Sequence, residues 1–366
     1  MCNYREYILM NKDREILEFI SETNEFDEVC LEQISECTEE LPIGFYDIQT
    51  FIESRRVPKH RKHIMKLMRE SGCDNLNGFL RVSKALSLND TYWVKEKSSD
   101  LKWSQVSLYQ NDFNEIVAQL AFDGGNYNLK FTSTSPEYTT NGQYAKCWKR
   151  FGNEIYLIKD TGAGAQAEFY ASQIARHICR SYVEYDLLKF KGREVSRCKL
   201  FTSEKEGFLP AVRLVDERSH NKISYLLKYF GDLGFDDDFR RMIVLDALIL
   251  NTDRHAGNYG VIVDNETQKI QRMAPVFDHN LSLFSDFDVI TEHSAKDIIP
   301  RIGGDFCTAA GLVLTPEIRN DLMNLKGFRF SRGDEYGWPE ERLRILEGIM
   351  DRQIEKILEM DRINKA

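Results

Sequence analysis

The 366-residue sequence lacks the patterns that mark secreted, membrane-spanning and zinc-binding proteins. Its eight cysteines include no CxxC pair and no zinc spacing, a usage typical of reduced thiols in the cytosol. Arg5 and Glu6 stand where a signal peptide would need an apolar run, and no apolar segment is long enough to cross a bilayer. We therefore expect a cytoplasmic protein without membrane contact.

The sequence also has no excess of positive charge. The 49 basic and 58 acidic residues give a formal charge of −9, which argues against broad attraction to nucleic acid. One basic stretch, residues 55–63, continues into an amphipathic pattern at 64–68 and favours the solvated face of a helix over a nucleic-acid patch. The seven histidines form no ligand cluster, and Arg332-Gly333-Asp334 is most simply a turn. We expect no direct contact with nucleic acid.

The most informative pattern lies in the C-terminal half. Asp253 is followed five positions later by Asn258, and Asp278 ends a short apolar segment twenty residues further on. This order and spacing are typical of a kinase catalytic-loop aspartate, a metal-binding asparagine and a metal-binding aspartate. A five-residue loop can place one carboxylate at an acceptor hydroxyl and turn an amide oxygen back toward magnesium. The alternative is an ordinary polar turn, because Asn, Asp and Gly are common turn residues.

The surroundings of this pattern favour the catalytic interpretation. Residues 242–250 are almost wholly apolar and follow the acidic run 236–238, which predicts a core helix that delivers Asp253 to a cleft. Residues 261–263 and 275–277 are predicted to be short strands on either side of a turn at Asp264-Asn265.

A kinase also needs a cation for the nucleotide phosphates. Lys159 ends the apolar strand predicted at 154–159, and a turn at Gly152-Asn153 joins this strand to one at 145–150. Helical spacing over 167–178 puts Glu168 in a first turn, where it could pair with Lys159 and direct the ammonium to the phosphates. A structural lysine at a strand end is the alternative.

A hydroxyl-rich stretch, residues 131–144, precedes the hairpin. As a loop over the phosphates it would offer backbone N–H groups, with Gly142 permitting close approach and Lys146 adding a second phosphate contact. A solvated surface loop is equally compatible with its composition. Its hydroxyls are candidates for self-phosphorylation, at Thr132, Ser133, Thr134, Ser135, Thr139 and Thr140.

One rival pattern belongs to another class of enzyme. Residues 162–167 match a dinucleotide-binding fingerprint, with Asp186 at about the expected distance, so a Rossmann oxidoreductase is an alternative. Against it, Lys159-Asp160-Thr161 separates the strand from the first glycine, and Glu168 would repel a pyrophosphate. These glycines also suit a flexible connection between strand and helix.

On these residues the chain resembles the HipA-like family of bacterial Ser/Thr protein kinases. The segments that carry the resemblance are Asn251-Thr252-Asp253-Arg254-His255 with Asn258, Phe277-Asp278, Leu157-Ile158-Lys159, and the N-terminal stretches 51–58 and 86–93. It implies an α+β, two-lobed, protein-kinase-like fold, with ATP and Mg²⁺ as cofactors, Asn258 and Asp278 as metal ligands and Asp253 at the acceptor. It also implies a protein substrate and an antitoxin-like protein partner.

The sequence divides in three on this interpretation. We expect a mostly helical N-terminal subdomain at 1–125 with one strand region near 90–103, a nucleotide-binding lobe at 126–215 with a small antiparallel sheet, and a helical lobe at 216–366. Residues 209–215 are predicted as a buried strand, and 339–360 as a closing helix. A binding module with feeble activity and a lipid or small-molecule kinase remain alternatives.

Overall fold

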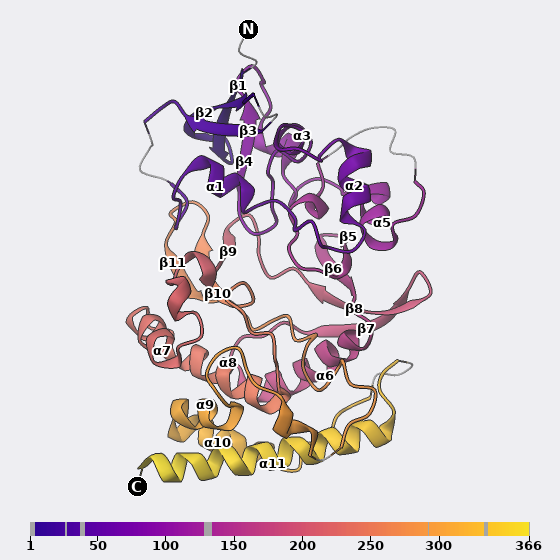
Figure 1. Ribbon diagram of the computed structural model, residues 1–366, viewed down its shortest axis with the longest axis vertical. Coiled ribbons are helices and arrows are strands. Elements are labelled where there is room, and N and C mark those ends of the chain that lie inside the picture. Colours follow the sequence, from indigo (N-terminus) through magenta and orange to yellow (C-terminus); the bar gives the residue numbers. More distant parts are fainter. Residues whose placement is uncertain are drawn as a thin grey trace. The chain divides into compact units, whose positions relative to one another are not determined.

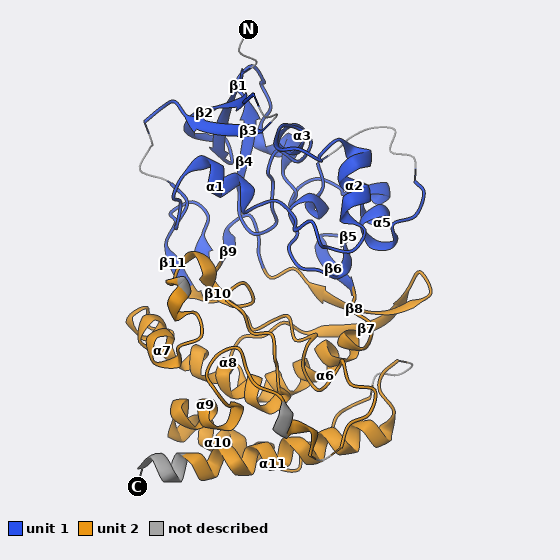
Figure 2. Cartoon of the chain, viewed as in Figure 1, with its two compact units in different colours: residues 1–159, 202–209, 262–271 blue, residues 160–201, 210–261, 272–366 orange. Residues whose placement is uncertain are grey.

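The computed structural model describes residues 4–25, 28–36, 41–127, 134–291, 293–332 and 336–365. The chain forms two compact units that interleave in sequence (Figure 2). Unit 1 contains Met1–Lys159, Thr202–Leu209 and Ile262–Gln271, and unit 2 contains Asp160–Phe201, Pro210–Val261 and Arg272–Ala366. The functional division at residues 125 and 215 stays a prediction.

Unit 1 begins with an antiparallel sheet of order β3-β2-β1-β4 (Figure 1). Its strands are β1 (Tyr4–Asn11), β2 (Arg14–Thr23), β3 (Val29–Gln33) and β4 (Tyr92–Glu96). β4 confirms the predicted tryptophan-containing strand, whereas the helical expectation is wrong for the residues that form β1, β2 and β3. The turn between β1 and β2 has no glycine, and Lys12 takes the left-handed conformation there with φ 52°. Without a glycine signal, short apolar runs are ambiguous between strand and buried helix.

In the described residues of unit 1, this sheet is accompanied by helices α1 (Ile48–Glu53), α2 (Ile64–Ser71), α3 (Leu76–Ser83), α4 (Trp103–Val106) and α5 (Glu115–Asp123). Asp47, Asn75 and Asn114 cap α1, α3 and α5 by accepting hydrogen bonds from backbone N–H groups of the first turns. Apolar side chains of the strands and helices share one buried core, which includes Phe19, Phe79 and Leu120.

The basic stretch 55–63 is not the solvated helix face that we expected. Arg55 is buried and forms a bidentate ion pair with Asp90. Arg61 is buried and donates to the carbonyl oxygens of Glu137, Thr140 and Lys146. Both arginines satisfy internal acceptors of unit 1, so the charge at these two positions is structural.

The predicted hairpin is present as β5 (Ala145–Phe151) and β6 (Glu154–Asp160), with Gly152 at φ 60° in the turn. A further sheet has the order β11-β10-β9, from β9 (Glu206–Pro210), β10 (Gly260–Asp264) and β11 (Ile270–Met273). Two strand predictions are corrected here. The strand expected at 209–215 ends at Pro210 and continues as the 3-10 turn η2 (Ala211–Arg213). The sheet partners of β10 are β9 and β11, and residues 275–277 do not form one of its strands.

Unit 2 is mainly helical, as predicted for the C-terminal part. Its helices are α6 (Ala163–Ile178), α7 (Ile223–Asp232), α8 (Asp236–Ile249), α9 (Phe306–Val313), α10 (Pro316–Leu325) and α11 (Glu340–Lys365), with 3-10 turns η3 (Glu217–Ser219) and η4 (Ser294–Asp297). α8 is buried on nearly every side and packs against α6, α7, α9 and α11, which confirms the predicted core helix (Figure 1). The hairpin β7 (Tyr185–Phe190) and β8 (Arg193–Lys199) packs on α6.

The described helices include none with the length and apolar character needed to span a membrane. The six cysteines that the structure describes are all unbridged, in agreement with the predicted reduced thiols, while Cys2 and Cys37 lie outside the described residues.

Candidate functional site

α8 delivers the candidate catalytic loop. Leu250 ends the helix in the left-handed conformation with φ 53°, which turns the chain sharply out of the core. Asn251 is buried and donates its backbone N–H and its side-chain amide to Asp246 of α8, at 3.0 Å each. Its Oδ1 in turn accepts from the N–H of Asp253 at 3.1 Å. The start of the loop is therefore fixed to the helix before Asp253 is reached.

Hydrogen bonds close the five-residue loop on itself. Asn258 is buried, and its Nδ2 donates to the carbonyl oxygen of Asp253 at 3.2 Å. The N–H of Asn258 donates to the carbonyl oxygen of His255 at 2.8 Å. Because Nδ2 is the atom bonded to the loop backbone, Oδ1 is the side-chain atom of Asn258 that could bind a metal.

A single guanidinium, that of Arg254, connects this loop with the segment before Asp278. Arg254 is 1% exposed, and its Nη1 donates to the carbonyl oxygens of Asn258 and Phe277, at 2.9 and 2.7 Å. Its Nε and Nη2 bond Asp246. Burial alone would lower the pKa of Arg254, but the Asp246 carboxylate raises it overall, so the charge is retained. Arg254 thus holds the backbones of Asn258 and Asp278 next to each other.

Asp278 itself occupies a left-handed conformation, with φ 60°. Its N–H donates to the Tyr185 hydroxyl at 3.0 Å. Burial raises the pKa of Tyr185 well above its ordinary value, and the nearby charge of Glu168 adds to the rise, with Cys198 and Asp278 contributing further. The Tyr185 hydroxyl is therefore neutral where it accepts the hydrogen bond from Asp278. A non-glycine residue held at positive φ is a form of strain that is frequent at functional sites.

Glu168 is fully buried in α6 and accepts a hydrogen bond from the Ser196 hydroxyl. The helix starts at Ala163 rather than 167, so the expectation that Glu168 lies in the first turn is wrong. Gly164, expected in a flexible connection, lies inside α6, where an added Cβ would meet the backbone oxygen of Asn280 at 2.9 Å. The glycine thus permits close packing of α6 on the segment after Asp278.

The donor chemistry fits magnesium. Magnesium prefers oxygen ligands and usually takes one or two from the protein, with substrate phosphates and water supplying the rest. Asn258 and Asp278 would provide one amide oxygen and one carboxylate. Within the described residues no group of three or more His, Cys, Asp or Glu side chains is placed to hold a metal.

Two further side chains adjoin Asp253. His255 accepts a hydrogen bond from the N–H of Gly257 at its Nδ1 (3.0 Å). Burial lowers the pKa of His255 from its ordinary value, although the charges of Asp253 and Asp278 oppose the shift, so His255 is mainly neutral at pH 7. Arg301 forms an ion pair with Asp253, with 2.9 Å between Nη2 and Oδ1.

The remaining predicted residues lie in unit 1. Lys159 is 5% exposed at the end of β6, as predicted. Because Glu168 belongs to unit 2, the pairing of Lys159 with Glu168 stays a prediction. Gly142 and Lys146 do lie together: Gly142 has φ 98°, and an added Cβ would meet the Lys146 ammonium, which donates to the Asn141 carbonyl oxygen at 2.8 Å.

The hydroxyl-rich stretch is only partly the open loop that we expected. Ser135 and Thr139 are buried on either side of the 3-10 turn η1 (Pro136–Tyr138). Ser135 donates to the buried Glu137 carboxylate, and Thr139 to the Leu86 carbonyl oxygen. Residues 141–143 are exposed, whereas Thr132 and Ser133 lie outside the described residues. Among the described residues of this stretch, the exposed tip around Gly142 is the part that could cover a nucleotide.

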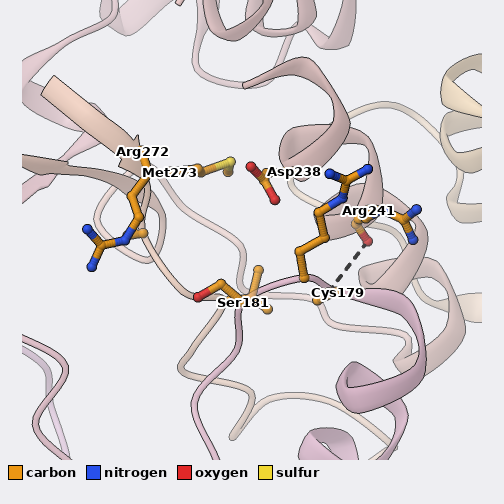
Figure 3. A pocket seen from close by; sticks show the side chains of 9 residues that line it. Cys179, Ser181, Asp238, Arg241, Arg272 and Met273 are labelled. Carbon is orange, nitrogen blue, oxygen red and sulfur yellow. Dashed lines mark hydrogen bonds between the residues drawn. The ribbon is translucent and has the colours of Figure 1, made fainter. Parts of the chain in front are cut away.

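A cavity of about 200 Å³ in unit 2 contains none of the predicted site residues (Figure 3). Its lining residues are Cys179, Arg180, Ser181, Asp238, Arg241, Arg272, Met273, Ala274 and Val276. Arg241 is bound by Asp237, Asp321 and the Ile178 carbonyl oxygen, which explains its burial without a ligand. The cavity does not alter the assignment of the site.

No model of a known protein family matches the chain, and no curated protein matches it. Among solved structures, the chain matches HipA of Shewanella oneidensis MR-1, from a toxin-antitoxin complex of HipA, HipB and operator DNA. The TM-score is 0.59, with 12% identity over 98% of this chain and 99% of that one. The chain has a HipA-like fold. The proinflammatory kinase CtkA of Helicobacter pylori also matches, at TM-score 0.46 and 20% identity over 60% of this chain and 93% of that one.

The HipA-like fold confirms the predicted α+β, kinase-like class and removes the fold basis of the oxidoreductase alternative. Sequence reasoning missed Asp246, Tyr185 and Arg301. Asp246 left a signal, because it is the one charged residue in the apolar run 242–250. Tyr185 and Arg301 left none, since each reaches the site through tertiary contacts.

Proposed function

We propose that the chain is an ATP-dependent protein kinase that transfers the γ-phosphate to a serine or threonine hydroxyl. In this proposal Asn258 and Asp278 bind magnesium, which neutralises phosphate charge when it is present, and Asp253 orients or deprotonates the acceptor hydroxyl. Lys159 binds nucleotide phosphates with help from Glu168, and the backbone at Gly142 and the Lys146 ammonium are further phosphate contacts.

One observation carries the proposal. Arg254 donates from the same nitrogen to the carbonyl oxygens of Asn258 and of Phe277, the residue before Asp278. The two carbonyl oxygens are far apart in sequence, and one buried guanidinium holds them next to each other. A polar turn without a function has no physical need for such a buried charge. Preorganised ligands are what a site for a charged transition state requires.

The acceptor and the partner are proposed less specifically. The HipA structure was solved with HipB and operator DNA, so we propose an antitoxin-like protein partner for this chain and a cytoplasmic location. The formal charge of −9 assigns any DNA contact to that partner rather than to the chain itself. A kinase for a lipid or small-molecule acceptor would use the same residues. A binding module with feeble activity would still bind the protein partner but would transfer little or no phosphate.

The test compares three variants by transfer of labelled phosphate from ATP and by calorimetric titration of Mg-ATP. Asp278→Asn should weaken Mg-ATP binding by about 10-fold or more and abolish transfer. Asp253→Asn should abolish transfer yet leave nucleotide binding largely intact. Asp186→Asn is the matched control, because Asp186 is exposed and would matter only to the dinucleotide alternative.

Two results would contradict the proposal. Loss of nucleotide affinity in Asp253→Asn as severe as in Asp278→Asn would mean that the roles are wrongly assigned. A wild-type chain that binds a protein partner but neither binds nor turns over Mg-ATP would be a binding module.

A further inference from the structure

The Arg301 guanidinium occupies the acceptor side of the candidate site. Its Nη2 lies 2.9 Å from Oδ1 of Asp253, and the two side chains are 59% and 19% exposed. An acceptor hydroxyl that hydrogen-bonds Asp253 must therefore arrive beside this guanidinium. The neighbouring His255 adds little charge at neutral pH, because its pKa is lowered by burial.

The backbone next to Arg301 is fixed. Ile302 is buried, and the N–H of Gly303 donates to the Asn221 carbonyl oxygen at 3.1 Å. Gly303 has φ 85°, and an added Cβ would meet Ile223 Cδ1 at 2.9 Å and Ala309 Cβ at 3.1 Å. Only glycine suits this position, so the chain cannot easily shift there. Arg301 can change partner by side-chain rotation while its guanidinium stays near Asp253.

The ion pair with Asp253 is of a kind that exchanges easily. Its Arg301 side is solvent-exposed, and ion pairs that solvent reaches contribute little stability. Asp253 needs its carboxylate for the incoming hydroxyl, so the acceptor competes with Arg301 for the same group. A guanidinium released in this way is the preferred partner of a carboxylate or phosphate.

We propose that Arg301 determines acceptor specificity: it leaves Asp253 when the acceptor binds and pairs with an acidic side chain close to the acceptor hydroxyl. This inference rests on the proposed kinase function. In the transfer, the acceptor oxygen bonds to the γ-phosphorus, the bond from that phosphorus to the bridging oxygen of ADP breaks, and the hydroxyl proton passes to Asp253. Arg301 forms no covalent bond and supplies only charge complementarity.

The experiment uses three synthetic peptides of equal length with a central serine, flanked by glutamates, glutamines or lysines. Wild-type chain with Mg-ATP should phosphorylate the glutamate peptide about 10-fold more efficiently, in kcat/KM, than the glutamine peptide. Arg301→Gln should abolish this preference, and Arg301→Glu should shift it toward the lysine peptide. Arg344→Gln, which removes an exposed arginine paired with Glu340 on the same helix, is the control and should keep the wild-type preference.

The remaining outcomes separate this inference from the proposed function. Equal rates on the three peptides would overturn the role of Arg301, as would transfer to none of them by a chain that still turns over ATP. A uniform loss on all peptides in Arg301→Gln would mean that Arg301 contacts the transferred phosphoryl group instead. No ATP turnover by the wild-type chain would overturn the proposed function and this inference together. ATP affinity and melting temperature, measured in each variant, should equal those of wild type.

Discussion

Arg254 combines a structural and a positioning task in one side chain. It neutralises the buried Asp246, and it donates to the carbonyl oxygens of Asn258 itself and of Phe277, the residue before Asp278. Removing one partner of a buried ion pair costs more than removing both, because the remaining charge stays desolvated.

We expect Arg254→Met to lower the free energy of unfolding by about 3–5 kcal/mol, since Asp246 is left buried and unpaired. The double variant Arg254→Met, Asp246→Asn should lose less. Urea denaturation followed by circular dichroism measures both. Arg344→Met, at an exposed pair, is the control and should change stability by less than about 0.5 kcal/mol. Equal losses in the single and double variants would show that the ion pair is not the cause.

Lys159 is the candidate cation for the nucleotide phosphates. Lys159→Met keeps the length of the apolar stem and removes the charge, so Mg-ATP affinity should fall by about 10-fold while the fold is retained. Calorimetry and thermal melting are measured on the same sample. A collapse of the melting temperature with unchanged affinity in the folded fraction would identify Lys159 as a structural residue.

At the scale of elements, the structure of the hydroxyl-rich stretch limits which of its hydroxyls can be phosphorylated. Ser135 and Thr139 are buried with acceptors inside unit 1, and the Thr140 hydroxyl donates to the Pro136 carbonyl oxygen at 2.7 Å. Self-phosphorylation by the proposed kinase within residues 132–140 should therefore spare Ser135 and Thr139. The added charge should repel the γ-phosphate and inhibit the enzyme.

Peptide mass spectrometry after incubation with Mg-ATP tests this expectation, with Asp253→Asn as the inactive control. Phosphate at Ser135 or Thr139 would require that the η1 region opens, contrary to its packing. Wholly unmodified loop peptides from an active enzyme would remove the regulatory idea and leave the kinase proposal in place.

Elements with a strong periodic or turn signal could be predicted, and the others could not. α8 has its acidic first turn and apolar body, and β5 and β6 have Gly152-Asn153 between them. The first two strands meet at Lys12, a non-glycine left-handed residue, and so escaped prediction. Residues 275–277 looked like a strand because they are apolar, but Val276 forms only an isolated parallel bridge with Tyr182.

The motif residues could be predicted as neighbours because loop length limits their separation. The hydrogen bonds and ion pairs that hold them in place could not be predicted. The partners of Arg254 lie before and after it in sequence and are selected by packing, which spacing alone does not encode. Arg301 meets Asp253 across 48 positions, and nothing in its own neighbourhood distinguishes it from a surface arginine.

At the scale of the whole molecule, charge makes the clearest prediction. With a formal charge of −9 and two arginines of its basic stretch buried, the chain alone should bind a 30-base-pair duplex with a dissociation constant weaker than about 10 µM at physiological salt. Fluorescence anisotropy measures it. Tight, salt-dependent binding by the isolated chain would contradict the assignment of DNA contact to a partner.

The two backbone hydrogen bonds that join the end of α8 to the segment after Asp278 have a consequence for local opening. Thr252 N–H donates to the Leu281 carbonyl oxygen, and Leu283 N–H donates to the Ile249 carbonyl oxygen. Neither segment can therefore move away while the other keeps its place. The catalytic loop and the Asp278 segment should then open as one cooperative unit, with similar amide hydrogen-exchange protection at Thr252 and Leu283. A kinase built this way would lose or keep its metal ligands together, and would have no half-assembled site to populate.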